Sequence, residues 1–392
     1  MNPVLSRLGG YPLAAFQGLA RRMRTEQEPS FDFSIGDPVE PTPTFIRQAL
    51  IDAVPIVSQY PTAAGLSELR DAIAGWVDRR FGVTVDPDTQ VLPTAGSKEA
   101  IFHAPLALLD ATSDRRACIW GSPGYQPYER GALFAGGESD RIDLTDAQEW
   151  KLELGTLGPA RLDRAFIAWL NYPHNPTGAV VDTAYLRRQL ETARDHGIVL
   201  GSDECYVDIY PPGGPVPPSV LDVAEGDLSG ILVAFSLSKR SGMTGYRCGA
   251  LVGDAELISQ QRLMRPNIGT GSPEFVQMAA AAAWADDGHV AQRRETFEAK
   301  RKVMLQFCSD VDLQVGGSEA TFYLWIAVPG GDDVGYCKAL LRKRIIASPG
   351  SAFGPAGAGW SRLALVPDVK QCQVAAQVWR EAISDGSLDD HE

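Results

Sequence analysis

A lysine follows a buried stretch of this chain, in the segment Ser236-Leu237-Ser238-Lys239-Arg240. The apolar run 231–235 before it predicts a buried strand, and a buried ammonium is costly unless it is used or paired. Two serine hydroxyls precede Lys239, and Arg247 lies eight residues beyond it. A nucleophilic amine beside a ready-made anion site suggests a Schiff base to a phosphorylated aldehyde cofactor, pyridoxal 5′-phosphate (PLP).

The length, composition and charge of the chain indicate how large a fold it can form and which partners it is not expected to bind. The chain has 392 residues, 44% apolar and 22% charged, which is enough for two packed lobes. It carries 36 basic and 49 acidic residues, a net charge of −13, so we expect no binding to nucleic acid or to an acidic membrane. Only eight of the basic residues are lysines, so Lys239 has few competitors for a chemical role.

The cysteines, the apolar runs and the N-terminal stretch indicate the cellular compartment in which we expect the protein. The N-terminal stretch has no charged region followed by a long apolar one, so we expect no signal peptide. The longest apolar run, 275–284, is too short to span a bilayer. The six scattered cysteines form no Cys-x-x-Cys pair and predict reduced, buried thiols in a cytoplasmic protein: Cys118, Cys205, Cys248, Cys308, Cys337 and Cys372.

Short β-rich runs alternate with helical patterns in the middle of the chain. The clearest helix begins after Asp182, a good N-cap, and ends at Gly197. This rhythm predicts an α/β fold, with a mostly parallel sheet covered by helices on both faces. The predicted strands are 90–93, 117–120, 165–170, 198–202, 231–235 and 249–253.

The last hundred residues predict a smaller α+β lobe. It has a charged helix over 289–307, a strand pair around 322–328 and 345–348, and a final helix over 369–383. The irregular N-terminal residues are expected to pack against this lobe. We therefore predict an N-terminal arm with part of the small domain at 1–45, a large domain at 46–285 and a small C-terminal domain at 286–392.

Two polar groups follow predicted strands, where open α/β sheets place their ligands. The loop from Asn171 to Gly178 contains Asn-Pro-Thr-Gly at 175–178, although a plain Asn-Pro turn is the alternative. Asp203 ends the next strand. A carboxylate there could keep a pyridine nitrogen charged, so that the ring absorbs the electrons of a carbanion. The alternative for Asp203 is the N-cap of the next element.

Three further positions could bind anions or a flat ring. Gly96, Ser97 and Lys98 open a helix whose free N–H groups suit a phosphate, although ordinary capping gives the same pattern. Tyr125 could stack on a cofactor, or belong to the core. Arg362 could hold a substrate carboxylate with two parallel hydrogen bonds, or lie solvated on the surface.

In this order the motifs resemble the class I/II, fold type I PLP-dependent aminotransferases, from the Ile35-Gly36-Asp37-Pro38 region to Arg362. The resemblance implies a large domain with a mostly parallel seven-stranded sheet between helices, a smaller α+β domain, and a homodimer with shared active sites. It implies no metal. Motifs of other enzyme classes, such as Gly-x-Gly-x-x-Gly after a strand, a Walker loop, His-Glu-x-x-His and Gly-x-Ser-x-Gly, are absent from the sequence.

The resemblance also implies residue roles. Lys239 would be the Schiff-base lysine and proton shuttle, Asp203 would pair with the pyridine nitrogen, and Arg362, Gly36 and Asn175 would bind substrate. Tyr60 would reach the partner subunit's phosphate site, and the segment 265–272 would face the partner's site. Asn175 and Tyr206 would bond the ring oxygen, Tyr125 would stack on the ring, and the phosphate would be held by Gly96, Ser97, Lys98, Ser236, Ser238 and Arg247.

Several stretches resemble the succinyldiaminopimelate transaminases of lysine biosynthesis, including the opening Met1-Asn2-Pro3 with Tyr11-Pro12, and Ser202–Tyr206. N-succinyl-LL-2,6-diaminopimelate, with glutamate and 2-oxoglutarate, is therefore the expected substrate. Gly242 and Thr244 depart from that subgroup and are nearer to LL-diaminopimelate aminotransferases. The alternatives are that activity, a broad-specificity aminotransferase, or a C–S lyase on the same fold. A non-catalytic regulator is not favoured, because the stretch before Gly36 is too short for a DNA-binding domain.

Overall fold

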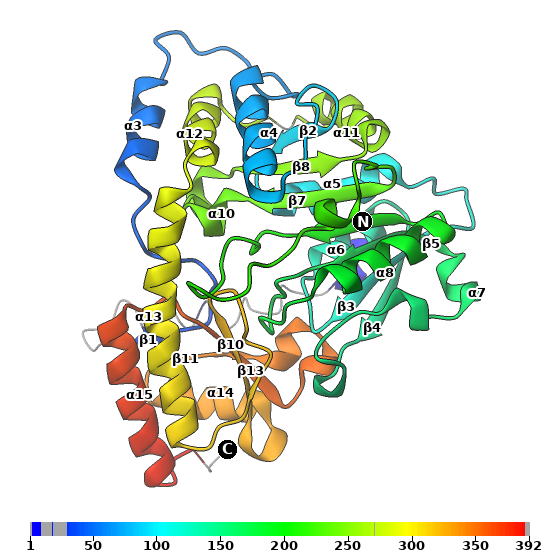
Figure 1. Ribbon diagram of the computed structural model, residues 1–392. Helices are drawn as coiled ribbons and strands as arrows, with labels where there is room; N and C mark the ends of the chain where they lie inside the picture. Colours follow the sequence, from blue (N-terminus) through cyan, green and yellow to red (C-terminus); the bar gives the residue numbers. More distant parts are fainter. Residues whose placement is uncertain (1, 9–17, 19–29, 270, 389–392) are drawn as a thin grey trace.

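Two lobes joined by a long helix make up the computed structural model, which describes residues 2–8, 18, 30–269 and 271–388 (Figure 1). Tyr11-Pro12, residues 19–29 of the predicted N-terminal arm and residue 270 lie outside the described residues. Within the described part of the chain, no helix is long and apolar enough to cross a membrane.

Seven strands form the sheet of the large lobe, in the order β2-β8-β7-β6-β5-β3-β4. β8 runs antiparallel to both its neighbours, and the other neighbouring pairs are parallel. The strands are β2 Val91–Thr94, β3 Ala117–Ser122, β4 Glu138–Asp143, β5 Ala165–Leu170, β6 Val199–Asp203, β7 Ile231–Ser236 and β8 Gly249–Gly253. The predicted mixed α/β fold with a mostly parallel seven-stranded sheet is confirmed.

Helices cover both faces of this sheet because successive strand side chains point to opposite sides. In β7, Ile231, Val233 and Phe235 belong to one buried cluster, and Leu232 and Ala234 belong to another. The first cluster includes residues of α3 Thr44–Asp52, α4 Ser67–Phe81, α8 Thr183–Asp195 and α12 Glu274–Ala285. The second includes residues of α5 Ser97–Leu108, α6 Pro127–Phe134 and α11 Ala255–Ile268.

The edge strand β4 is the one large-lobe strand that the sequence patterns miss. Its sequence, Glu-Ser-Asp-Arg-Ile-Asp, is polar, and its side chains are exposed or half-buried. An edge strand pairs on one side only, so it needs no apolar run. The six other strands lie within two residues of their predicted ends. Asp182 caps α8 as predicted, accepting a hydrogen bond from the Tyr185 amide at 2.7 Å.

The small lobe has a four-stranded antiparallel sheet in the order β12-β13-β10-β9. The predicted pairing of 322–328 with 345–348 is wrong, because β13 lies between β10 and β12, and β11 pairs instead with β1. The elements are β1 Phe31–Asp32, β9 Val315–Gly316, β10 Tyr323–Ala327, β11 Ile345–Ile346, β12 Ser348–Pro349, β13 Trp360–Ala364, α14 Asp333–Arg342 and α15 Val369–Ser384.

The long helix α13, Gly288–Asp310, runs from one lobe to the other (Figure 1). Near its start, Arg293 donates through Nε to the carbonyl oxygen of Lys239 at 3.3 Å. Farther along, Lys300 donates to the carbonyl oxygens of Leu365 and Val366, at 3.1 and 3.0 Å. The helix α13 thus contacts both lobes. The predicted domain boundaries at 45/46 and 285/286 stay predictions.

Candidate active site

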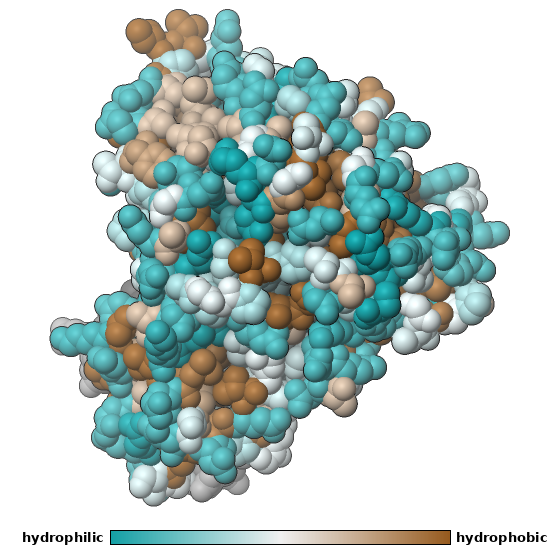
Figure 2. Space-filling model, in the orientation of Figure 1, coloured by the Kyte–Doolittle hydropathy of each residue, from teal (hydrophilic) through white to brown (hydrophobic). Residues whose placement is uncertain are grey.

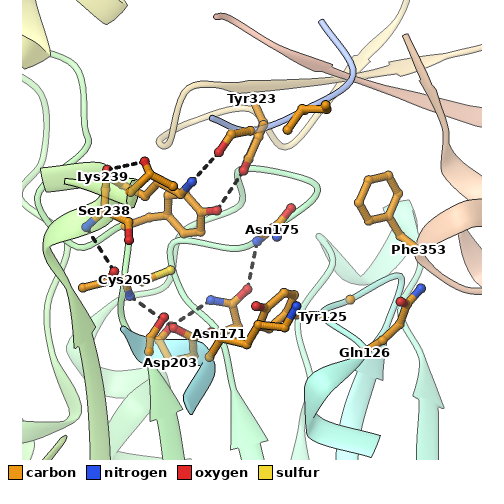
Figure 3. A pocket seen from close by; sticks show the side chains of 18 of the residues that line it. Tyr125, Gln126, Asn171, Asn175, Asp203, Cys205, Ser238, Lys239, Tyr323 and Phe353 are labelled. Atoms are coloured by element: carbon orange, nitrogen blue, oxygen red, sulfur yellow. Dashed lines mark hydrogen bonds between the residues drawn. The ribbon is translucent and has the colours of Figure 1, made fainter. Parts of the chain in front are cut away.

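The cavity that collects the predicted residues opens at the carboxyl ends of β5, β6 and β7 (Figure 3). Figure 3 shows Lys239 and Phe353 on opposite sides of it, with Asn175 between them. The predicted residues that line the cavity are Gly36, Ser97, Lys98, Tyr125, Asn175, Asp203, Tyr206, Ser236, Ser238, Lys239, Arg247 and Arg362. Gly96 adjoins it as the N-cap of α5.

Lys239 lies on α10, Leu237–Arg240, which begins directly after β7. Ser236 caps this turn by accepting the Ser238 amide at 3.2 Å, and Lys239 Nζ donates to the carbonyl oxygen of Gly36. Burial lowers the pKa of Lys239 to about 8 from 10.5, against the partial compensation of Cys205 and Asp37. A sizeable fraction of this amine is therefore neutral, and nucleophilic, near neutral pH.

Asp203 is a buried carboxylate at the end of β6. Its Oδ2 accepts the Tyr128 hydroxyl at 2.8 Å, and its Oδ1 accepts the Cys205 amide at 3.3 Å. Burial raises the pKa of Asp203 to about 6, and the hydrogen bonds from Tyr128 and Cys205 oppose that rise. The group thus stays mainly ionised at pH 7, as a partner for a positively charged ring nitrogen must.

Asn171 joins the Asn-Pro-Thr-Gly loop to Asp203. Its Nδ2 donates to the backbone oxygen of Asp203 at 2.7 Å, and its Oδ1 accepts the Asn175 amide at 3.0 Å. Asn175 Oδ1 in turn accepts from Arg362 Nη1 at 2.9 Å. The loop is therefore part of the cavity wall and is hydrogen-bonded to Asp203 and Arg362. A plain turn would not require these contacts.

One end of the cavity is built for an anion. Gly96 has φ +87°, and a Cβ there would lie 2.6 Å from Nη2 of Arg247, so glycine is needed for this approach. Arg247 is held by the carbonyl oxygens of Ala95 and Thr244, each at 2.9 Å. Burial lowers the pKa of Lys98, and Arg130 and Arg247 lower it further. Crowded cations at a helix N-terminus complement a phosphate.

Arg362 lies on β13 with its guanidinium between two rings. The Tyr323 ring centre is 4.3 Å from Cζ, and the Phe353 ring centre is 4.4 Å away. Nη2 donates to the Ser34 carbonyl oxygen at 2.8 Å, and the buried Nε has no hydrogen-bond partner. Arg362 is 4% exposed, which excludes the solvated surface role. A planar, buried guanidinium with a spare donor suits a substrate carboxylate.

Along with the described residues of the segment 265–272, Tyr60 lies outside this cavity. It is fully exposed and does not line the cavity of its own chain. Its predicted place is the partner subunit's phosphate site, so that role stays a prediction.

Sequence patterns missed several residues that line the cavity or contact its lining residues from behind. Asn171 stands inside a motif that was recognised, and only its role was overlooked. Tyr128 lies three residues after Tyr125, and this spacing at a helix start was the available signal. Tyr323 carries no local signal, because both faces of β10 are buried. Gln126, Cys205 and Phe353 also line the cavity.

The residues present fit PLP. A lysine with a lowered pKa, a buried carboxylate and a cationic helix terminus match the aldehyde, ring nitrogen and phosphate of that cofactor. Tyr125 supplies an aromatic ring at the cavity wall. The spare Nε of Arg362 and the paired hydroxyls of Tyr206 and Tyr323, 2.8 Å apart, offer hydrogen-bonding groups for substrate and ring oxygen.

Comparisons with known proteins agree with this geometry. Residues 28–378 match the family model "Aminotransferase class I and II". An LL-diaminopimelate aminotransferase of Nitratidesulfovibrio vulgaris is 32% identical over 377 residues, covering 95% of this chain and 96% of that protein. The structure of an aminotransferase from Neisseria meningitidis has a TM-score of 0.89 and 33% identity, and the match covers 97% of this chain and 100% of that one. That of a probable N-succinyldiaminopimelate aminotransferase from Thermus thermophilus has a TM-score of 0.87 and 28% identity, covering 95% and 100%. This chain therefore belongs to the class I and II aminotransferases, a family of PLP-dependent enzymes.

Proposed function

We propose that this chain transfers an amino group between LL-diaminopimelate and 2-oxoglutarate. The observation that carries the reaction type is the meeting of Lys239, Asp203 and Arg362 in one cavity. Lysine biosynthesis through diaminopimelate is the pathway that this substrate indicates. The substrate itself is taken from the name of the Nitratidesulfovibrio relative.

The succinylated substrate expected from sequence is the second candidate. It is supported by the name of the Thermus structure, which is 28% identical, and by the resemblance of Ser202–Tyr206. The unsuccinylated substrate has the better support, because the relative at 32% identity over 377 residues carries its name. Gly242 and Thr244 point the same way. We therefore place LL-diaminopimelate ahead of its succinyl derivative.

Lys239 would perform the proton transfer. When bound, PLP supplies an aldehyde that takes up the amino group and a ring that withdraws electrons from the substrate α-carbon. Nζ of Lys239, whose pKa is about 8, would accept the α-proton as a neutral amine and then, as an ammonium, pass it to the cofactor carbon that carried the aldehyde. The carboxylate of Asp203 keeps a positive charge on the ring nitrogen favourable throughout.

The other cavity residues would hold the reactants. Arg362 binds the α-carboxylate through its planar guanidinium, and Asn175 keeps that guanidinium in place. Gly36 closes the substrate side, and Tyr125 covers the ring. Because donor and acceptor would use the same Arg362, the first oxo acid must leave before the second substrate enters, which gives ping-pong kinetics.

We also propose a cytoplasmic homodimer in which Tyr60 reaches the partner's phosphate end. Support comes from the loop between α3 and α4, where Ile56, Val57 and Tyr60 are largely or wholly exposed. Figure 2 shows apolar side chains gathered at the tip of this loop. Large apolar side chains in such number on one loop indicate a contact surface. The cytoplasmic location is supported by six free cysteines.

A half-reaction panel tests the function. Purified protein loaded with PLP should absorb in the visible, and an amino donor should remove that band. The panel compares LL-diaminopimelate, N-succinyl-LL-diaminopimelate, aspartate and an aromatic amino acid, with Lys239→Ala as the inactive control. LL-diaminopimelate should react fastest. Preference for the succinylated compound would reverse the order of the two candidates. A thioether amino acid is tested beside the panel, and release of a thiol from it would indicate a C–S lyase. Protein that takes up no PLP would refute the proposal.

A further inference from the structure

Tyr323 lies where three functional groups of the cavity meet, although no sequence motif marks it. Its hydroxyl oxygen is 2.8 Å from that of Tyr206, and its ring lies against the guanidinium of Arg362 at 4.3 Å. Tyr323 is 2% exposed and Tyr206 is 4% exposed. Figure 3 shows Tyr323 coming down from the small lobe towards Lys239.

Gly36 gives Tyr323 the space to reach this point. A Cβ at residue 36 would lie 2.1 Å from the Tyr323 hydroxyl oxygen, closer than any real contact allows. The carbonyl oxygen of the same glycine accepts the Lys239 ammonium. The close packing of Gly36 against Tyr323 therefore defines the hydroxyl's position relative to the reactive amine.

Hydrogen counting then orients the tyrosine pair. A phenol has one hydrogen to donate, and one hydrogen bond between two phenols uses one of their two hydrogens. Geometry alone allows either oxygen to be the donor. If Tyr206 donated to Tyr323, it would have no hydrogen left for another acceptor. Tyr206 can donate to the oxygen of the cofactor ring only if Tyr323 is the donor within the pair.

We propose that Tyr323 is a positioning residue of the transamination site: its hydroxyl donates to Tyr206 and leaves the Tyr206 hydrogen for the cofactor's ring oxygen, while its ring holds Arg362 flat for the substrate carboxylate. This inference rests on the proposed function. The hydroxyl acts on Tyr206 and the cofactor ring, and the aromatic ring acts on Arg362 and substrate binding. Removing the hydroxyl and removing the ring should therefore have different effects.

Two substitutions separate these parts. Tyr323→Phe removes the hydroxyl and keeps the ring, whereas Tyr323→Leu removes both. The hydrogen bond that Tyr206 accepts from Tyr323 orients and polarises the Tyr206 hydroxyl, which in turn stabilises the anionic form of the ring oxygen. Losing the Tyr323 hydroxyl therefore weakens that stabilisation and raises the pH at which the visible band of the PLP-loaded enzyme titrates. Tyr323→Phe should raise that midpoint by about half a pH unit to one unit and leave KM within about twofold. Tyr323→Leu should in addition raise KM for the amino donor by about fivefold or more.

A double-mutant cycle shows whether Tyr323 acts through Tyr206. Tyr206→Phe alone should raise the titration midpoint, and adding Tyr323→Phe should shift it no further. The matched control is Tyr336→Phe, which removes another buried phenol of the small lobe, one that accepts from Trp379 Nε1 at 2.9 Å. It should leave both midpoint and KM unchanged, and thermal unfolding reports the stability of each variant.

The inference is overturned if Tyr323→Phe leaves the midpoint of the wild type, or if it shifts the midpoint equally when Tyr206 is already phenylalanine. These outcomes differ from failure of the proposed function, in which the wild-type protein takes up no PLP or keeps its visible band when amino donors are added.

Discussion

The phenolic oxygen of Tyr128 lies 2.8 Å from Oδ2 of Asp203 and donates its hydrogen to that carboxylate, although 75 residues separate the two. The contact opposes the effect of burial, which raises the pKa of Asp203 to about 6. The charge of the Asp203 carboxylate at neutral pH therefore depends on a side chain of α6, a helix that lies between β3 and β4 in the chain, whereas Asp203 ends β6.

Removing that hydroxyl should shift the acid side of the activity profile. In Tyr128→Phe the pKa of Asp203 should rise above 6, because a hydrogen bond to the ionised form is lost. We expect activity at pH 7 to fall roughly tenfold and to recover at higher pH. The measurement is kcat against pH, with Tyr185→Phe, a buried phenol bonded to the Leu152 carbonyl, as control. An unchanged profile would separate Tyr128 from the charge of Asp203.

A lysine in place of Arg362 should weaken carboxylate binding. Arg362→Lys keeps the charge but loses the planar fork that lies between Tyr323 and Phe353. KM for donor and oxo acid should rise about 10- to 100-fold, with the visible band of the PLP-loaded resting enzyme unchanged. Arg380→Lys, at an arginine paired with Asp310 on the surface, is the control. Equal kinetics in the two variants would assign the carboxylate to another group.

The rate at which Lys239 captures added PLP should depend on pH. Its pKa of about 8, lowered from 10.5 mainly by burial, means that the neutral amine increases as pH rises through 8 and is complete above it. Capture should therefore accelerate up to about pH 9 and then level off. Stopped-flow absorbance over a series that brackets 8 measures this. A capture rate that still increases as the pH approaches 10.5 would show an ordinary, solvated lysine.

Glu204 should make stability fall with rising pH. Burial raises its pKa to about 7 from 4.5, against hydrogen bonds from Ser219, the Val220 amide and Ser202. The folded state thus binds the extra proton between 4.5 and 7, so its free energy of unfolding declines across that window and is flat above it.

Glu204→Gln should abolish this decline. The difference in free energy of unfolding between wild type and variant should change by on the order of 3 kcal/mol from the lower to the upper end of the window. Urea titrations of both proteins at matched pH give that difference, in which the contribution of Asp203 cancels. Parallel curves would show that Glu204 is ionised in the folded protein.

A charge in the loop between α3 and α4 should weaken self-association. Val57 is 72% exposed in the single chain, and Val57→Glu would bury a carboxylate if that loop contacts a second copy. Light scattering should find a dimer for wild type and a mass distribution shifted towards monomer for the variant. Val216→Glu, at another exposed valine, is the control. Identical masses for all three proteins would place any contact elsewhere.

The sequence was informative where a functional residue ends a strand or sits in a loop motif. Asp203 ends β6, and Lys239 and Asn175 follow β7 and β5, so an apolar run with a polar end was enough to locate them. Tyr128 and Tyr323 act through partners 75 and 117 residues away, and such contacts depend on how distant segments pack. The pairing error in the small lobe has the same origin, because short antiparallel strands carry no local record of their neighbours.

Arg293 and Lys300 are seven positions apart on α13, a distance of about 10 Å along the helix axis. The first contacts the backbone of Lys239, and the second contacts the chain just beyond β13, the strand that carries Arg362. The length of this helix segment thus sets the distance between the Lys239 amine and Arg362. Inserting one residue between 293 and 300 would rotate its two ends by about 100° relative to each other, and would misplace both groups while every motif remained intact.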